Sequence, residues 1–224
     1  VALVGGGNNA QPGEISFAHN GVLFLDELPE FKRNVLEVLR QPMEERRVMI
    51  SRARVSVEYP ANFMLLAAMN PCPCGYYNHP EKECVCGPGV VQKYLNRISG
   101  PLLDRIDLHV EVVPVSVSEI SQTADGEKST FIRERVINAR KIQEQRFEGS
   151  SIHSNAQMTS KQVKVICVIS TAGHTLLNNA MDKLGLSARA YDRILKVSRT
   201  VADLAGSDDI KIEHLAEAIQ YRSL

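Results

Sequence analysis

The stretch GVLFLDELPEF, at residues 21–31, decides the fold of the first half of this chain. Its apolar run, Val22–Leu25, predicts a buried strand of the parallel type, because such strands are covered on both faces. Asp26 and Glu27 follow at once, at the edge where open α/β sheets bind their ligands. One carboxylate there can hold hydrated Mg²⁺ while its neighbour polarises a water, and nucleotide hydrolysis needs both. Alternatively, the acidic pair only caps the helix that follows.

The composition is that of an ordinary globular protein. Hydrophobic residues make up 44% of the 224 positions, charged residues 23%, and the formal net charge is zero. This balance points to no nucleic acid or anionic membrane, so any basic surface must be local. We see neither a membrane-spanning run nor a signal peptide, and we expect a cytoplasmic protein without membrane contact. Because the sequence lacks an initiator Met, we expect a piece of a longer protein.

The first part of the chain, residues 1–117, alternates short strands with helices. Its second apolar run, residues 63–69, predicts another buried strand that ends at Asn70. Turn and periodicity rules then predict a helix near 30–43, a β-hairpin around 48–57, a short helix near 90–97 and a strand over 106–113. The predicted fold class is α/β, with a parallel sheet, helices and an inserted β-hairpin.

The second part is predicted to be helical almost throughout. Residues 118–128 have the polar composition of a linker, and residues 129–224 carry helical periodicity. Thr159 and Ser187 are good N-caps for two of the helices. We predict an all-helical domain with helices near 129–147, 159–170, 173–184, 188–205 and 211–222.

Asn70 is the polar residue that directly follows the second predicted strand. Two parallel strands that end at the same edge would put Asn70 near Asp26 and Glu27. An amide at that place can hydrogen-bond a γ-phosphate or the attacking water without adding charge. The alternative is that Asn70 and Pro71 simply form a turn.

Two arginines are candidates for phosphate contacts. Arg105 lies in the segment PLLDRID, and an arginine delivered by a neighbouring subunit can stabilise transition-state charge. Alternatively, Arg105 pairs with Asp104 or Asp107 at the surface. Arg189, near the start of a predicted helix, is a further candidate. Its alternative is an exposed helical arginine paired with Asp192.

A second basic feature is the predicted hairpin, which carries four arginines within nine residues: Arg46, Arg47, Arg52 and Arg54. Arginines on a projecting hairpin can neutralise DNA phosphates with little sequence preference. The alternative is ordinary solvated charge, partly offset by Glu44, Glu45 and Glu58. The sequence alone leaves both interpretations open.

Four of the five cysteines fall within fifteen residues: Cys72, Cys74, Cys84 and Cys86. Two C-x-C pairs can supply four thiolates to a tetrahedral structural Zn²⁺ site. The spacing is tighter than the usual C-x₂-C, and His79 could replace one thiol. Alternatively, the cysteines are reduced and unligated, or form disulfides on oxidation. The fifth, Cys167, fits a small buried residue of a helix.

Four motifs in order give the chain a family resemblance. GVLFLDELPEF at 21–31 looks like a Walker B strand, and AAMNP at 67–71 looks like sensor 1. SGPLLDRIDL at 99–108 looks like an arginine-finger segment, and LSARAYDRILKVSRTVADLAG at 186–206 looks like a sensor 2 helix. Together they resemble the Mg-chelatase-like AAA+ ATPases, and among these the ComM/YifB family.

The resemblance implies a partial AAA+ P-loop NTPase core followed by a helical lid, with ATP and Mg²⁺ as ligands. Asp26 would associate with Mg²⁺, Glu27 would activate water and Asn70 would be sensor 1. Arg105 would be the arginine finger and Arg189 the sensor 2 residue. ATP would lie between identical subunits of a ring, expected to be a hexamer. The basic hairpin resembles a pre-sensor hairpin, which implies DNA contact during branch migration or helicase work in natural transformation and recombination.

The chain departs from this family at the phosphate-binding loop. A Gly-x-x-x-x-Gly-Lys-Ser/Thr loop should precede the Asp26 strand, but the glycines at 5–7 are followed by asparagines and no lysine. We expect that loop upstream, so the chain alone should bind ATP weakly or not at all and should not hydrolyse it. Two other functions stay open: a chelatase-type motor acting on a metal-insertion partner, and a zinc-stabilised interaction module without catalysis.

Overall fold

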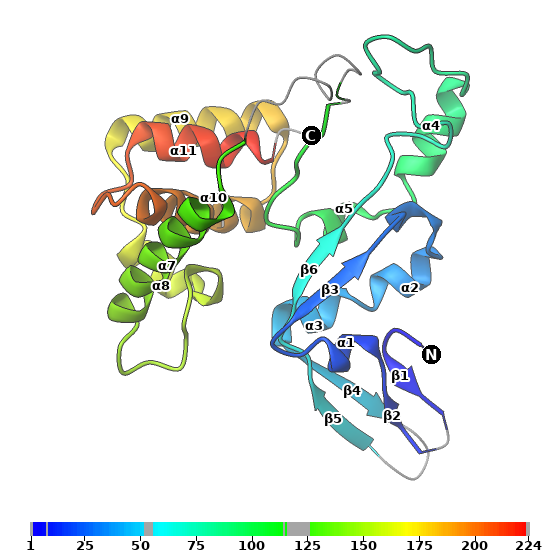
Figure 1. The fold of residues 1–224 in the computed structure, drawn as a ribbon, viewed down its shortest axis with the longest axis horizontal. Coiled ribbons are helices and arrows are strands. Elements are labelled where there is room, and N and C mark those ends of the chain that lie inside the picture. The colour runs from blue at the N-terminus through cyan, green and yellow to red at the C-terminus, as the bar shows by residue number, and fades with distance from the viewer. Residues whose placement is uncertain (1, 8, 52–55, 114, 116–125, 223–224) are drawn as a thin grey trace. The chain divides into compact units, whose positions relative to one another are not determined.

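The computed structural model describes residues 2–7, 9–51, 56–113, 115 and 126–222 (Figure 1). The chain forms two compact units, Val1–Ile106 and Asp107–Leu224, and each has a hydrophobic core of its own. Unit 1 mixes short strands with helices, and unit 2 is helical, which confirms the predicted fold class. The contacts divide the chain earlier than the predicted boundary at residue 117. The predicted linker, 118–128, lies mostly outside the described residues.

The centre of unit 1 is a parallel pair of strands. β3 (Val22–Leu25) pairs with β6 (Met64–Ala67), and the register sets Leu25 opposite Ala67. Both predicted strands and their parallel order are therefore confirmed. The expectation that these strands are buried is wrong. Leu23 and Leu25 are buried, but Val22 and Phe24 of β3 are 51% and 55% exposed, and Met64 and Leu66 of β6 are 60% and 52% exposed. One face of the β3–β6 pair packs on the core of unit 1. Among the described residues, the side chains on its other face remain exposed.

The segment between these strands begins with three short helical pieces: η1 (Leu28–Glu30), α2 (Arg33–Glu37) and α3 (Arg40–Glu45). The single helix predicted near 30–43 is therefore wrong. Pro42 gives the physical reason, since it has no N–H to donate to a preceding carbonyl and is tolerated only in a first helical turn. It occupies that place in α3, where it is buried.

A β-hairpin follows, as predicted. β4 (Arg47–Ser51) pairs in antiparallel fashion with β5 (Ser56–Pro60), and the connecting residues 52–55 lie outside the described part of the chain. Alternation along β4 buries Val48 and Ile50 against the core of unit 1. The hydrophobic core is completed by Ile15, Leu23, Leu25, Leu28, Leu36, Leu39, Ala61, Ile98 and Leu102.

The remaining elements of unit 1 are short. β1 (Gly5–Gly6) pairs with β2 (Gln11–Pro12), and α1 (Glu14–Phe17) follows directly. After the cysteine loop come α4 (Pro88–Leu95), close to the helix predicted near 90–97, and α5 (Gly100–Leu103).

The strand predicted over 106–113 is wrong, because the described residues there form no strand. Val110 and Val112 are 64% and 84% exposed. A strand requires a neighbouring backbone to complete its hydrogen-bond ladder. In this segment the His109 N–H donates to the Tyr221 carbonyl at 2.8 Å, and a single bond of this kind makes no ladder.

Unit 2 contains the five predicted helices, each within a few residues of its expected bounds: α7 (Ser129–Arg146), α8 (Ser160–Ile166), α9 (Thr171–Leu184), α10 (Ala188–Leu204) and α11 (Ile212–Gln220). A short turn, η2 (Asn155–Gln157), precedes α8. Both predicted N-caps are confirmed: the Ser187 hydroxyl accepts from the Ala190 N–H, and Thr159 forms a capping box with Gln162. Among the described residues, no helix combines the length and the apolar character that a membrane span requires.

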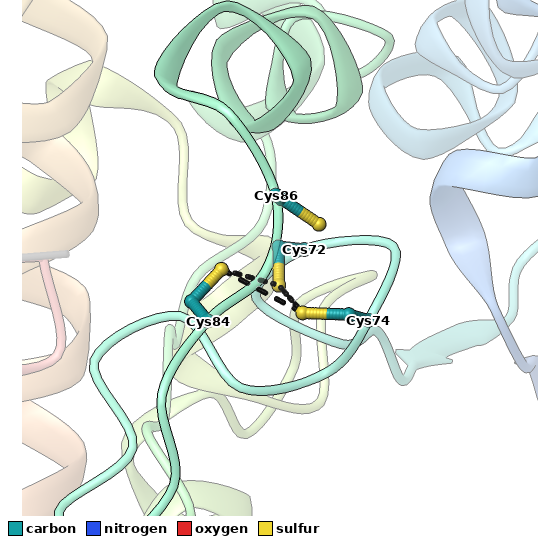
Figure 2. Close-up of side chains that lie close together, drawn as sticks. All are labelled: Cys72, Cys74, Cys84 and Cys86. Atoms are coloured by element: carbon teal, nitrogen blue, oxygen red, sulfur yellow. Dashed lines mark hydrogen bonds between the residues drawn. The ribbon is translucent and has the colours of Figure 1, made fainter.

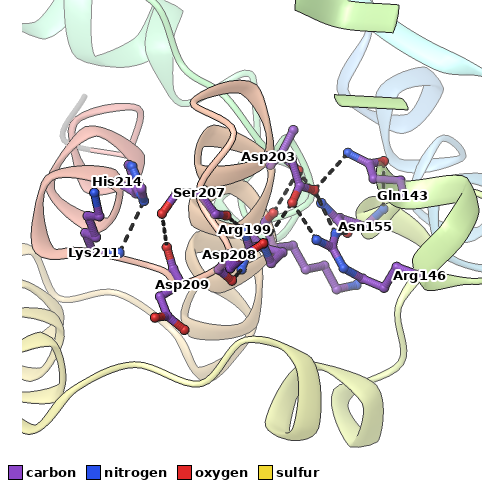
Figure 3. A network of polar contacts seen from close by, with 12 residues as sticks. Gln143, Arg146, Asn155, Arg199, Asp203, Ser207, Asp208, Asp209, Lys211 and His214 are labelled. Carbon is purple, nitrogen blue, oxygen red and sulfur yellow. Dashed lines mark hydrogen bonds and ion pairs between the residues drawn. The ribbon is translucent and has the colours of Figure 1, made fainter. Parts of the chain in front are cut away.

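A buried ionic network joins α7, η2 and α10 (Figure 3). The Asp203 carboxylate pairs with Arg146 at 2.5 Å and with Arg199 at 3.1 Å. Asn155 donates to it at 2.7 Å and Gln143 at 3.3 Å. The network is a structural element of unit 2, and sequence analysis did not identify it because its members lie far apart in the chain.

Candidate nucleotide edge and cysteine cluster

Asp26 and Glu27 lie in the turn that ends β3. The Glu27 N–H donates to the Asp26 carboxylate at 2.8 Å, and both residues are exposed. The Glu27 backbone is left-handed, with φ 49° and ψ 47°, which costs a non-glycine residue about 1 kcal/mol. Such strained positions are concentrated at functional sites. Two open carboxylates at the carboxyl end of a parallel strand suit a hydrated cation and a water molecule.

Asn70 follows β6 at the same edge. Ala68 is held there by two hydrogen bonds, since its N–H donates to the Leu25 carbonyl at 2.9 Å and its carbonyl accepts from the Leu28 N–H at 3.0 Å. Asn70 lies two residues further on and is exposed. The carboxyl ends of β3 and β6 therefore meet, as the sequence predicts. The roles of the three polar residues at this edge stay predictions.

Arg105 is buried and paired with Glu44, whereas the sequence suggested either a free arginine finger or a surface pair with Asp104 or Asp107. Its side chain is 5% exposed, lies 2.7 Å from the Glu44 carboxylate and donates to the Pro101 carbonyl at 2.5 Å. Its Nε is buried without a hydrogen-bond partner among the described residues. Asp107, one of the expected partners, pairs with Arg193. Sequence reasoning missed Glu44, and no local pattern could reveal a partner so distant in the chain.

An arginine finger would have to leave this ion pair to reach a nucleotide on another subunit. The role of Arg105 stays a prediction. Arg189 is the second residue of α10 in unit 2, and it is exposed. Its proposed helical partner, Asp192, accepts a hydrogen bond from the Ser160 hydroxyl at 2.5 Å.

The described arginines of the hairpin have protein partners or partial burial. Arg47 pairs with Glu58 at 3.1 Å and with Glu45 at 3.5 Å, and its side chain is 53% exposed. Arg46 ends α3 in a left-handed conformation, and burial lowers the pKa of its guanidinium. These positions fit offset surface charge. Arg52 and Arg54, at the tip, lie outside the described residues.

The four clustered cysteines converge, with all four sulfur atoms within 4.8 Å of one another (Figure 2). The Cys72 Sγ atom lies 3.4 Å from the Sγ of Cys74 and 3.7 Å from that of Cys84, and the Sγ atoms of Cys74 and Cys84 are 3.6 Å apart. A tetrahedral zinc with Zn–S bonds of about 2.3 Å requires sulfur separations of about 3.8 Å, which these distances approach. A disulfide requires about 2.0 Å. The cysteines are unbridged, and the donor set fits a four-thiolate metal site.

Backbone groups organise these thiols. The Gly75 N–H donates to the Cys72 carbonyl at 3.0 Å, in a turn that needs the positive φ of 82° at Gly75. A hydrogen bond from the Tyr76 backbone lowers the pKa of the Cys74 thiol to about 6. At Cys84 a backbone hydrogen bond from Cys86 lowers the pKa of the thiol. Burial and the neighbouring thiols raise it by more, so the net result is a pKa of about 12. Cys74 therefore ionises at lower pH than Cys84.

His79, the alternative metal ligand, has another role. Its Nδ1 accepts hydrogen bonds from the Glu81 and Lys82 N–H groups at 3.0 and 3.1 Å. Its ring also makes an edge contact with Tyr76, at 5.6 Å between centroids. His79 is thus an organiser of the loop, and it is not part of the four-residue metal-binding group found among the described residues.

A parallel strand pair ending in acidic and amide residues, followed in the chain by a helical unit, is consistent with a partial AAA+ core and a helical domain. The family model "Magnesium chelatase, subunit ChlI" matches residues 1–120, and its C-terminal companion matches residues 126–222. The chain belongs to this magnesium chelatase family, as the resemblance of its motifs indicates.

Individual relatives agree with this family. The chain is 50% identical over its whole length to the competence protein ComM of Haemophilus influenzae, and 45% identical to the uncharacterized protein YifB of Escherichia coli. It is 25% identical, over 73% of its length, to the magnesium-chelatase subunit ChlI of Cyanidium caldarium. The chain spans 43% of ComM and of YifB, and the match to the Cyanidium subunit spans 40% of that protein. The chain therefore corresponds to less than half of each of these relatives.

Proposed function

We propose that this chain is part of a Mg²⁺-dependent AAA+ ATPase whose nucleotide edge is built from Asp26, Glu27 and Asn70. The observation that carries this proposal is the parallel pairing of β3 and β6, which brings the carboxyl ends of both strands together. Asp26 would hold the magnesium ion, which supplies charge neutralisation for the phosphates when bound. Glu27 accepts a proton from the attacking water, and the Asn70 amide donates a hydrogen bond to the γ-phosphate or orients that water.

The arginines complete the proposed site across subunits. Arg105 of a neighbouring subunit would neutralise charge that develops on the transferred phosphoryl group, and Arg189 would contact phosphate through α10. This requires a ring of identical subunits, proposed to be a hexamer. It also requires that Arg105 exchange its ion pair with Glu44 for the nucleotide, so assembly would be coupled to a local rearrangement.

This polypeptide by itself is proposed to be inactive. The sequence holds no Gly-x-x-x-x-Gly-Lys-Ser/Thr loop, which supplies the backbone N–H groups and the lysine that bind the β- and γ-phosphates. Measurable ATP turnover by the 224-residue chain at ordinary protein concentration would contradict this proposal. A polypeptide of the length of the relatives is the appropriate protein for activity measurements.

The work coupled to hydrolysis is proposed to be DNA remodelling by branch migration or helicase action. The relative that is 50% identical is named a competence protein, which fits the handling of incoming DNA. The contact surface would be the hairpin that carries Arg46, Arg47, Arg52 and Arg54. Binding to DNA of unrelated sequences, weakening steeply with salt, is the expected behaviour of such phosphate contacts.

A chelatase-type motor is the second candidate. It is favoured by the magnesium chelatase family models and by the relatives named as chelatase subunits. DNA binding discriminates the two candidates, because a motor for a metal-insertion partner has no need of it. Salt-sensitive DNA binding by the longer protein favours remodelling of DNA, and its absence favours the chelatase-type motor.

The cysteine cluster is proposed to hold Zn²⁺. Four thiolates close the coordination sphere, which is the arrangement of structural sites, and leave no open position for a substrate. Metal analysis of the purified chain should find about one zinc per polypeptide. A chain without metal, whose cysteines all react with a thiol reagent, would contradict this.

The catalytic proposal is tested by the change Glu27→Gln in the longer protein. The amide cannot accept the proton of the attacking water, so ATP hydrolysis should fall by about a hundredfold or more while nucleotide binding persists. Glu14→Gln is the control, since Glu14 is an exposed carboxylate of α1 with no proposed role at the nucleotide edge. ATPase activity that survives Glu27→Gln would contradict the catalytic assignment of Glu27.

A further inference from the structure

We infer that the cysteine cluster is a metal clamp that holds Asn70 and α4 in place at the nucleotide edge. The inference rests on the proposed function of this edge, and it concerns positioning alone. The four cysteines would touch neither nucleotide nor water. Their metal would join the chain just after β6 to the chain just before α4.

The cysteine loop has no hydrophobic core of its own. Among residues 71–87, Cys72 is the one buried residue, and the segment contains neither helix nor strand. Fixing a segment of this length costs conformational entropy that its polar side chains cannot offset by burial. The convergence of the four sulfurs therefore needs a bound metal, whose binding free energy becomes folding free energy of the loop.

Asn70 lies between two anchors. On one side, Ala68 is fixed by its hydrogen bonds to β3 and to the turn after it. On the other side, Cys72 is fully buried and its sulfur contacts two other thiols. Each anchor is two residues from Asn70. Loss of the metal would release one anchor and leave the amide on a strand end that continues into an unfolded loop.

α4 connects the same clamp to the turn that contains Glu27. Cys86 is followed by Gly87, the N-cap of α4. Tyr94 near the end of α4 is buried, and this burial, followed by the negative charge of Glu30, raises the pKa of its hydroxyl.

The far end of α4 is attached directly to η1. The Arg97 guanidinium donates to the Pro29 carbonyl at 2.9 Å and to the Glu30 carboxylate at 3.1 Å. It also lies over the Tyr94 ring, 5.9 Å from the centroid. The helix is therefore held by the cluster at its start and by η1 at its end. Releasing its start would loosen both segments that carry the proposed catalytic residues.

Hydrogen exchange on the 224-residue chain tests the clamp without any nucleotide. Treatment of the zinc-loaded chain with EDTA should accelerate exchange at the Ala68 amide and in the first turn of α4 by about tenfold or more. The amides of α9, α10 and α11 in unit 2 should be unaffected, and they serve as the internal control. Unchanged exchange at Ala68 and α4 in a metal-free chain would overturn the inference, as would failure of the chain to bind Zn²⁺ at all.

Variants separate ligation from mere loss of a side chain. Cys84→Ser should abolish zinc binding and reproduce the fast exchange, whereas Cys84→His should restore both, because imidazole is a zinc ligand. The matched control is Cys167→Ala, which removes the cysteine of unit 2 and should leave the zinc content unchanged. If Cys84→Ser fails to fold, the EDTA experiment on the unaltered chain still decides the question.

The clamp and the proposed function can fail separately. A longer protein in which Glu27→Gln leaves ATP hydrolysis intact would refute the catalytic assignment while the exchange data still support the clamp. Conversely, the clamp alone is refuted if the longer protein is an active ATPase and removal of the metal leaves hydrogen exchange at Ala68 and α4 unchanged.

Discussion

Two aspartates show how differently the two units use a carboxylate. Asp203 in unit 2 is fully buried, and its oxygens are occupied by two arginines, an asparagine and a glutamine (Figure 3). Asp26 in unit 1 is exposed and, among the described residues, accepts a hydrogen bond only from the backbone of Glu27. A carboxylate whose partners are all internal serves the fold, and one with open lone pairs remains available to an external ligand.

Helix α10 of unit 2 and the β3–β6 pair of unit 1 also differ in how their apolar faces are covered. In unit 2 the residues of α10 that face inward, such as Ile194 and Ala202, are fully buried in a core shared with the other helices. In unit 1 the outer face of the β3–β6 pair leaves Phe24 and Leu66 more than half exposed. The inward face of α10 is thus covered by its neighbours, whereas among the described residues of unit 1 one face of the β3–β6 pair stays exposed.

The largest effect should come from breaking the network of unit 2. Asp203→Ala leaves Arg146 and Arg199 without their buried counter-charge and should lower the free energy of unfolding by about 3–5 kcal/mol. Thermal and urea denaturation followed by far-UV circular dichroism measures this. Asp209→Ala, at an exposed carboxylate nearby, is the control and should change stability by less than about 0.5 kcal/mol. If Asp203→Ala lowers the free energy of unfolding no more than Asp209→Ala does, the network contributes nothing to stability.

A second comparison lies within one strand. Leu25→Ala removes a buried side chain from the core of unit 1 and should cost about 2–4 kcal/mol of stability. Phe24→Ala, one residue earlier on the open face, should cost less than about 1 kcal/mol and should reduce binding of a hydrophobic dye. Denaturation and dye fluorescence check both. A large destabilisation by Phe24→Ala would mean that this face is packed in solution.

The ion pair of Arg105 offers a smaller effect. Glu44→Gln removes the charge opposite a guanidinium that is 5% exposed, so unit 1 should lose about 1–3 kcal/mol. Glu45→Gln, at the next position, affects the exposed Arg47 at 3.5 Å and should change stability by less than about 0.5 kcal/mol. In the longer protein, freeing Arg105 in this way tests whether Glu44 restrains the proposed finger, because nucleotide hydrolysis should then rise.

Acid should have the smallest effect over the ordinary pH range. Burial raises the pKa of Asp203, but hydrogen bonds from Arg146 and Asn155 and the two guanidinium charges lower it more, so the pKa lies below its ordinary value. A carboxyl with a lowered folded-state pKa contributes stability above its unfolded pKa and loses it as pH falls through the folded value. The thermal stability of unit 2 should therefore be flat above about pH 5 and fall below about pH 4. A fall that begins near neutral pH would point to a different group.

The candidate site shows how far sequence reasoning reached. The apolar runs before Asp26 and Asn70 were sufficient to predict two parallel strands ending at one edge, and the register confirms this. The four cysteines are close in sequence, so their convergence was also predictable. The partners of Arg105 and Asp203 were not, because Glu44 and Arg146 lie far from them in the chain.

The sequence by itself determined what depends on neighbouring residues: the helices of unit 2, the caps at Thr159 and Ser187, the hairpin and the order of the strands. These follow from hydrogen bonds and periodicities that span a few residues. Only the tertiary structure decided that one face of β3 is open, that residues 106–113 form no strand and that Arg105 is buried against Glu44. Burial and long-range pairing depend on which distant segments meet, and no local pattern contains that information.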